Sequence, residues 1–348
     1  MTRELTVLTW NLNGETYKGE DWVERQLEFI EEYCSAVDLF CFQAVNNEER
    51  EQDGWAGHLG ALLRYFDSEP REYHTVHTGD WARELRETDV QPHTDISGNH
   101  NRCNVIVSRW PIERRPLDLR NTGNRKPRGL NYYYSHFPEK ILVAEIDVSN
   151  IDSVASDRLE TWNVSINNGA YWGEEKVKML ETVYGRIHLQ NTKIGDPLIL
   201  SGDFNAPQKE TADKAIIPHS GPDYTNYPQY GNPYYFATDG ETPEEFTFGQ
   251  RWSKAEQQLF DPGLSEWEMR DAYLSLDEDT YEASTIDYTH KIHNGSPGKK
   301  RLDHILVSNQ FTVTDCEIWN GRGSSVNAMR TDETFRSDHA PVVATIRL

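Results

Sequence analysis

The sequence predicts an α/β fold whose strands form mixed sheets. Apolar segments with strand-like alternation recur along the 348 residues, and segments with helical spacing of apolar residues lie between some of them. Several neighbouring strands nevertheless follow one another without an intervening helix, which favours mixed over purely parallel pairing.

The N-terminal half begins with an alternating strand at residues 5–10. A helix follows, because Val23, Leu27, Ile30 and Cys34 recur at spacings of four, three and four. A short buried strand is expected over 38–43, and a second helix is marked by Trp55, Leu59, Leu62 and Phe66. Further strands are expected near 73–78, 103–108, 140–148 and 160–166.

The C-terminal half continues the alternation with a third helix, marked by Val177, Leu180, Tyr184 and Ile187. A buried strand at 197–200 runs into Gly202-Asp203-Phe204-Asn205, and later strands are expected near 302–307, 312–319 and 341–347. Two long irregular stretches, about 113–138 and 206–252, are typical of functional loops. We therefore expect one domain over 1–348 with these two inserted loops.

Composition excludes several classes of protein. No run of 18 apolar residues is present, so no membrane span and no membrane partner are expected. The N-terminus lacks the order of a secretion signal, and four cysteines without a CxxC pair fit a reduced, cytoplasmic protein. The net charge of -22 argues against broad non-specific binding of nucleic acid.

Basic residues are nevertheless clustered. Seven lie between Arg109 and Arg128, opposed by two acidic residues, and a second cluster is formed by Lys299, Lys300 and Arg301. Clustered cations on an acidic protein indicate a local phosphate-binding face, although such runs are also typical of solvated loops.

Polar residues follow or interrupt most of the predicted apolar strands. They are Asn11, Asn13, Gln43, Asn167, Asn168, Asp203, Asn205, Asp303, His304, Asp338 and His339. Each alone is typical of a turn or a helix cap. Together they indicate a site at one sheet edge, where α/β proteins bind ligands.

This ordered series resembles the endonuclease/exonuclease/phosphatase superfamily. The matching segments span nearly the whole chain and read TWNLNG at 9–14, FQAV at 42–45, VSRWPI at 107–112, SGDFNAP at 201–207, RLDHILV at 301–307 and SDHAPV at 337–342. Arg270-Asp271-Ala272-Tyr273 and Thr285 also fall where this superfamily often has similar residues. The resemblance implies a four-layer sandwich, with two mixed β-sheets packed face to face and helices on the outside.

The resemblance also implies roles for individual residues. Asp203 would activate the attacking water, with Asn205 beside it, and His339 would hold the scissile phosphate while Asp303 orients its ring. Asn11 and Asp338 would lie beside a Mg²⁺ or Mn²⁺ ion. Asn167 falls where many members have His or Tyr, and an amide cannot supply a proton at neutral pH.

Position 44 departs further from the family pattern. The family has the main metal-binding Glu at this position, whereas this chain has Ala44, whose methyl group cannot bind a cation. Three explanations are open: an engineered inactive variant, which we favour; a natural non-catalytic binder; or replacement by another carboxylate such as Glu15 or Glu48.

A metal-dependent nuclease is the favoured function, with nucleic acid as the partner and DNA favoured over RNA. Arg and Lys bind nucleic-acid phosphates, and unstacked bases stack on aromatic rings. The expected substrate-binding residues are Asn13, Arg102, Asn104, Arg125, Lys126, Arg128, Tyr132 and Tyr133. The alternatives are an inositol or lipid phosphate phosphatase of the same superfamily and a binder that does not cleave phosphodiesters.

Overall fold

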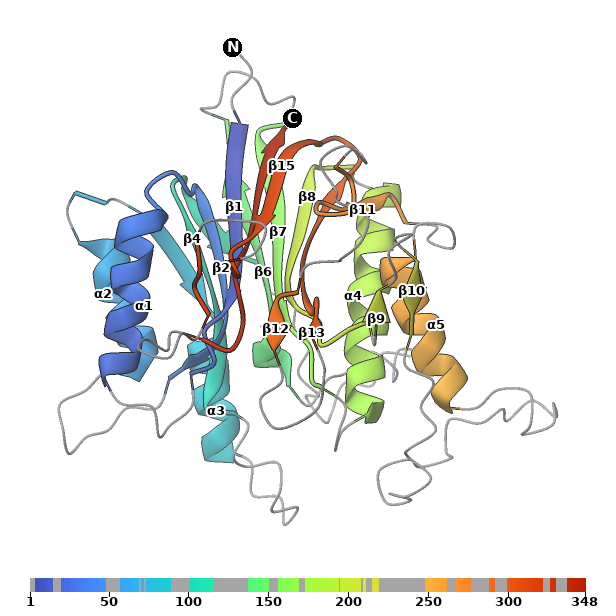
Figure 1. The fold of residues 1–348 in the computed structure, drawn as a ribbon, viewed down its shortest axis with the longest axis horizontal. Helices are drawn as coiled ribbons and strands as arrows, with labels where there is room; N and C mark the ends of the chain where they lie inside the picture. The colour runs from blue at the N-terminus through green and yellow to red at the C-terminus, as the bar shows by residue number, and fades with distance from the viewer. Residues whose placement is uncertain are drawn as a thin grey trace.

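Two six-stranded sheets form the centre of the molecule in the computed structural model (Figure 1). The structure describes residues 4–14, 20–47, 57–68, 70–71, 73–88, 100–115, 137–149, 156–168, 173–193, 195–207, 209–210, 215–218, 248–261, 267–276, 288–291, 299–321, 326–329 and 337–348.

The first sheet has the strand order β15-β16-β1-β2-β4-β3. Its strands are β1 (Glu4–Asn11), β2 (Leu39–Asn46), β3 (His74–His77), β4 (Arg102–Ser108), β15 (Thr312–Ile318) and β16 (Val342–Arg347). Only β1 and β2 pair in parallel within this sheet; the other pairs are antiparallel.

The second sheet has the order β11-β14-β8-β7-β6-β5. Its strands are β5 (Ile112–Arg114), β6 (Ile141–Asp147), β7 (Arg158–Ser165), β8 (Leu198–Asp203), β11 (Met269–Asp271) and β14 (Asp303–Ser308). Here too a single parallel pair, β7 with β8, lies among antiparallel neighbours. Both sheets are therefore mixed, as the sequence predicts.

Three apolar cores separate four layers. The core between the sheets joins residues such as Val7 and Ile106 to Leu142 and Ile199. The outer face of the first sheet packs against α1 (Glu20–Tyr33) and α2 (Gly57–Asp67). The outer face of the second sheet packs against α4 (Gly173–Lys193) and α5 (Phe248–Phe260), on the opposite side of the molecule (Figure 1). The predicted sandwich with helices on the outside is confirmed.

The remaining elements are short. They are α3 (Gly79–Thr88), the 3₁₀ helix η1 (Pro138–Lys140), β9 (Lys209–Glu210), β10 (Ile216–Ile217), β12 (His290–Lys291) and β13 (Lys299–Lys300). No helix in the described ranges is long and apolar enough to span a membrane. The four cysteines are buried and free, in agreement with the sequence.

A polar seam, formed by Thr9, Gln43, Asn104 and Asn163, crosses the core between the sheets. The Gln43 amide donates to Thr9 Oγ1 at 2.8 Å and to Asn163 Oδ1 at 2.7 Å. Asn163 in turn donates to the carbonyl oxygens of Phe42 and Val105, each at 2.9 Å. These bonds join β7 of one sheet to β1, β2 and β4 of the other, next to the ends of β1 and β8.

Candidate active site

The strand β1 runs away from the N-terminus in Figure 1, and Asn11, Asp203 and Asp303 lie together at the edge of the sandwich where this strand ends. In the first sheet Asn11, at the end of β1, is in register with Gln43 of the parallel strand β2. In the second sheet Asp203 ends β8 and pairs with Asp303 at the start of β14. Strand ends from both sheets meet at this edge, so residues that are distant in the sequence lie close together.

The centre of this site is formed by Asp203, Asp303 and His339. Their ligand atoms lie within 4.8 Å of one another, and all three residues are buried. Asp203 Oδ2 accepts a hydrogen bond from Asn11 Nδ2 at 2.8 Å, while its Oδ1 accepts the backbone N–H of Asn205 at 2.9 Å. The Asp203 carboxylate, which belongs to the second sheet, is therefore also bound by a residue of the first sheet.

The charge of His339 is set by its acidic neighbours. His339 Nδ1 lies 2.8 Å from Asp303 Oδ2, which places the ring proton of Nδ1 toward the carboxylate. Burial alone would lower the pKa of His339, but Asp303 and Asp203 raise it to about 10. Burial and the nearby Asp303 raise the pKa of Asp203, opposed by His339. At neutral pH the ring is therefore an imidazolium that can donate from Nε2.

Asp338 lies on the other side of His339. Its Oδ1 accepts a hydrogen bond from Asn13 Nδ2 at 2.6 Å, and its Oδ2 lies 3.8 Å from His290 Nε2. The His290 and His339 rings lie 4.6 Å apart. His290, Asp338 and His339 form a second group whose ligand atoms lie within 4.8 Å of one another.

The ligand atoms at this site are of the chemical type that binds a divalent cation. Asp338 and Asn11 supply oxygen atoms, which hard cations prefer. Asp303 Oδ1 is buried and has no hydrogen-bond partner among the described residues, so one carboxylate oxygen lacks a compensating proton or cation.

Ala44 occupies a bulge in β2, where the register shifts between Phe42 and Val45. Its φ of 52° is left-handed, and its side chain is buried, with 5% exposed. Asn13 and Asn205, with φ of 47° and 50°, share this backbone conformation. Non-glycine residues with such φ concentrate at functional sites. Glu15 and Glu48, the suggested replacement carboxylates, lie outside the described residues.

The other predicted substrate-binding residues differ in placement. Asn104 is buried, and its amide donates to the carbonyl oxygens of Lys140 at 2.8 Å and Asn163 at 2.9 Å, so its amide hydrogens are engaged within the protein. Arg102 is partly buried on β4, and Asn167 is partly buried after β7. Five predicted residues lie outside the described ranges: Arg125, Lys126, Arg128, Tyr132 and Tyr133.

The suggested basic face is not supported by the members that the structure describes. Arg109 pairs with Asp38, Arg114 with Asp80 and Arg115 with Glu145. Arg301 is buried between Glu210 and Asp271. These guanidinium groups are neutralised by carboxylates within the protein, which the linear charge pattern does not reveal.

Sequence reasoning missed three residues of this site. The Thr289 hydroxyl accepts the backbone N–H groups of Leu302 and Asp303 at 2.8 and 3.1 Å, whereas the suggested Thr285 lies outside the described residues. His290 follows Thr289, and Lys140 reaches Asn167 from η1. Thr289 and His290 form no motif before the fold is known, and Lys140 reads as an ordinary strand-flanking cation.

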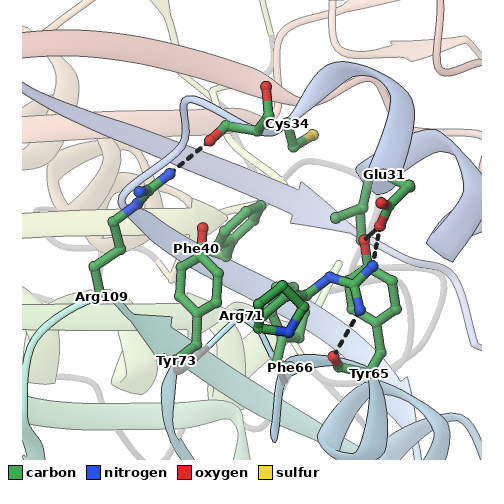
Figure 2. A pocket seen from close by; sticks show the side chains of 11 residues that line it. Glu31, Cys34, Phe40, Tyr65, Phe66, Arg71, Tyr73 and Arg109 are labelled. Carbon is green, nitrogen blue, oxygen red and sulfur yellow. Dashed lines mark hydrogen bonds and ion pairs between the residues drawn. The ribbon is translucent and has the colours of Figure 1, made fainter. Parts of the chain in front are cut away.

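A separate hollow of about 250 Å³ lies between α1, α2 and β2 (Figure 2). It is lined by Phe40 at the start of β2, whereas the active-site edge lies at the end of that strand. Its two arginines are already engaged: Figure 2 shows Arg71 with Glu31 and Arg109 with the carbonyl of Ser35. Arg109 also pairs with Asp38 and donates to the carbonyl of Val37. These contacts indicate that the residues lining the hollow connect the two helices to the sheet and have a structural role.

Comparison with known proteins identifies the family. The model of the Endonuclease/Exonuclease/phosphatase family matches residues 8–339. Among curated proteins, no sequence matches the chain.

Solved structures share the fold at low identity. An endonuclease/exonuclease/phosphatase from Bacteroides vulgatus is 14% identical with a TM-score of 0.54, and 99% of each chain is covered. D. rerio TDP2 in complex with single-strand DNA product is 11% identical with a TM-score of 0.51, again with 99% of each chain covered. The 3′ phosphatase NExo from Neisseria, bound to product DNA hairpin, is 16% identical with a TM-score of 0.50 and 98% of each chain covered. Because the family model matches nearly the whole chain, the chain belongs to the endonuclease/exonuclease/phosphatase family.

Proposed function

We propose that this chain is built to hydrolyse phosphodiester bonds with a divalent metal ion, and that its substrate is nucleic acid. The observation that carries the proposal is the convergence of Asp203, Asp303 and His339 within 4.8 Å at the junction of the two sheets. A single phosphate can contact both Asp203 and His339 in such a site, which general acid–base chemistry requires.

The residues divide the chemistry between them. Asp203 accepts the proton of the attacking water, and burial together with Asp303 raises its pKa, which makes the carboxylate a stronger base than an exposed one. The imidazolium of His339 donates to a phosphoryl oxygen, where negative charge grows in the transition state. Asp303 orients this ring through the 2.8 Å contact with Nδ1. A Mg²⁺ or Mn²⁺ ion held by Asn11 and Asp338 would polarise the phosphoryl oxygen.

Nucleic acid is favoured as the substrate by the solved structures of similar fold. The D. rerio TDP2 structure holds a single-strand DNA product, and the NExo structure holds a DNA hairpin. On this basis we favour DNA over RNA. The predicted contacts are Asn13, Arg102, Asn104, Arg125, Lys126, Arg128, Tyr132 and Tyr133.

Ala44 favours a second candidate, a protein that binds phosphodiesters without cleaving them. A methyl group supplies no ligand, so metal affinity and rate should both be low. The loss amounts to several kcal/mol of transition-state stabilisation in order of magnitude. The other carboxylates of the site and His339 are present. This favours a site that lacks only one side chain needed for full activity, as expected of an engineered inactive variant.

The experiment restores that side chain. Ala44→Glu should bind Mn²⁺ more tightly than the native chain in calorimetry, and should cleave a labelled oligonucleotide at least about 100-fold faster with Mg²⁺ or Mn²⁺. Ala44→Gln is the matched control, because it has the same size without the charge, and it should give neither gain.

Other outcomes would overturn the proposal. Release of phosphate from inositol phosphates, with no cleavage of DNA or RNA, would assign the chain to the phosphatases. Tight oligonucleotide binding without cleavage by either protein would establish the non-catalytic binder.

A further inference from the structure

Lys140 is fixed beside the catalytic centre by contacts at both of its ends. It is the last residue of η1 and immediately precedes β6. Its carbonyl oxygen accepts a hydrogen bond from the Asn104 amide at 2.8 Å. Its ammonium group donates to Asn167 Oδ1 at 2.5 Å and lies 4.7 Å from the centre of the Phe137 ring. The side chain is therefore held in one position, unlike that of a solvated lysine.

This contact determines which way the Asn167 amide points. An ammonium group has donors only, so the amide atom facing it must be oxygen. The amide nitrogen of Asn167 then faces away from Lys140; it is buried and has no hydrogen-bond partner among the described residues. A buried donor left unsatisfied is unfavourable, so this position is suited to an incoming acceptor such as a phosphate oxygen.

The charges around Lys140 come from three elements. Burial and Arg102 on β4 lower the pKa of Lys140, whereas Glu139 on η1 and Asp203 on β8 raise it, and the net result is a pKa of about 8. Glu139 is itself bound to His100, 2.9 Å from its Nδ1. Near neutral pH Lys140 is still protonated but gives up its proton more readily than an exposed lysine.

A second buried lysine shows what a structural role looks like in this protein. Burial lowers the pKa of Lys176 to about 8 as well. Its ammonium group, however, donates to the Asn205 carbonyl at 2.6 Å, faces Glu256 at 3.7 Å and lies over Trp252. The Lys176 ammonium group thus bonds to acceptors of the protein itself. The Asn167 amide beside Lys140, in contrast, has an N–H donor without an acceptor among the described residues.

From this geometry we infer that Lys140 is the general acid of the reaction and protonates the departing oxygen, with the Asn167 amide donating to the same phosphate. The inference rests on the proposed phosphodiesterase function. The water oxygen bonds to phosphorus and its proton passes to Asp203. The phosphorus–oxygen bond to the leaving group breaks, its electron pair stays on that oxygen, and the oxygen takes a proton from the Lys140 ammonium. Solvent then reprotonates the amine.

The test compares two leaving groups in the more active of the native chain and Ala44→Glu. One substrate is a DNA dinucleotide, whose leaving sugar alkoxide needs a proton. The other is a p-nitrophenyl ester of thymidine monophosphate, whose phenolate leaves without one. Lys140→Met should lose about 10²–10⁴-fold in kcat on the dinucleotide and less than about tenfold on the aryl ester. The fall in kcat of the parent above pH 8 should be absent in the variant.

Two variants separate proton transfer from charge and from folding. Lys140→Arg keeps the positive charge and a donor toward Asn167 but holds its proton, so it should be as slow as Lys140→Met on the dinucleotide. Lys254→Met, on the exposed face of α5, should match its parent on both substrates. NMR titration of ¹³Cε-labelled lysine, assigned by the loss of one signal in Lys140→Arg, should show a pKa of about 8.

Several results would overturn the inference. They are equal losses on the two substrates, full activity of Lys140→Arg, or a Lys140 pKa in the normal range of lysine. A parent without activity on either phosphodiester would instead remove the proposed function itself, and the NMR titration would still report on Lys140.

Discussion

At the residue scale, the Asp303 carboxylate controls the ionisation of His339. Asp303 is fully buried, with Oδ2 bound to the His339 ring and Oδ1 left without a partner among the described residues. The pKa of His339 is raised from 6.5 to about 10, mainly by Asp303 against the effect of burial. A raised pKa means that the folded protein holds this proton more tightly than the unfolded chain. The resulting stabilisation is complete below about pH 6.5 and is lost as the pH rises toward 10.

Asp303→Asn should therefore lower the pKa of His339 and slow catalysis. The expected loss in kcat is about 10²–10⁴-fold, because the ring loses both its orienting partner and its charge. NMR titration of the His339 ring proton measures the pKa, and oligonucleotide cleavage in the more active parent measures the rate. Urea unfolding at pH 6.5 and pH 10 should show a smaller loss of stability in the variant than in its parent. An unchanged His339 pKa would contradict this assignment.

At the element scale, Arg301 joins three segments behind the catalytic carboxylates. It precedes β14 and donates to Asp271, at the end of β11, at 3.0 and 2.9 Å. On its other side it donates to Glu210 of β9, one bond being 2.8 Å long. His304 extends this network, with its ring nitrogens 2.9 Å from Asp271 Oδ2 and from the Ala206 carbonyl. The chain after Asp203 and the strand that begins with Asp303 are thereby fixed to each other.

Arg301→Met should destabilise the protein by about 3–5 kcal/mol, because it leaves two carboxylates buried without their partner. Arg114→Met is the matched control: its pair with Asp80 is partly exposed and should contribute about 0–1 kcal/mol. Urea unfolding at pH 7 gives both values. Equal effects of the two substitutions would show that burial of the Arg301 network has no energetic consequence.

Acid should weaken the same network. Burial alone would raise the pKa of Asp271, but Arg301 and His304 hold it well below its usual range. A lowered pKa contributes stability above the unfolded value of about 3.8, which is lost as the pH falls below it. The native protein should therefore lose more stability between pH 5 and pH 3 than Arg301→Met, as measured by urea unfolding at the two pH values.

At the scale of the whole molecule, the sequence predicts the layers better than the site. Apolar periodicity is a local property, so it locates α1, α4 and the strands that line the cores. Contacts between the sheets are not local. The bond from Asn11 to Asp203 joins residues 192 positions apart, and the bond from Lys140 to Asn167 depends on how η1 meets β7. The family resemblance predicts that Asn11 and Asp203 share one site but not the bond between them, and no pattern along the chain indicates the contact of Lys140 with Asn167.

The two sheets each supply half of the site, so the polar seam between them sets its geometry. Asn11 and His339 belong to the first sheet or its flanking segment, while Asp203 and Asp303 belong to the second. Beneath them, Asn163 on β7 donates to two carbonyl oxygens of the opposite sheet and accepts from Gln43. An apolar residue at 163 would leave these two buried carbonyl oxygens without that donor, at a cost of about 1–3 kcal/mol each.

Asn163→Leu should therefore destabilise the protein by about 2–4 kcal/mol and also reduce kcat of the more active parent, because the separation of the sheets sets the distance from Asp203 to His339. Thr161→Val is the control within β7: the Thr161 hydroxyl is buried beside the Cys41 thiol, which is only a weak hydrogen-bonding group, so its removal should change stability by less than about 1 kcal/mol. Gln43→Leu combined with Asn163→Leu should cost less than the sum of the single changes, since each removes the same shared bond. Urea unfolding measures these free energies, and oligonucleotide cleavage measures kcat. If Asn163→Leu loses stability but keeps full kcat, the seam supports the fold without setting the catalytic geometry.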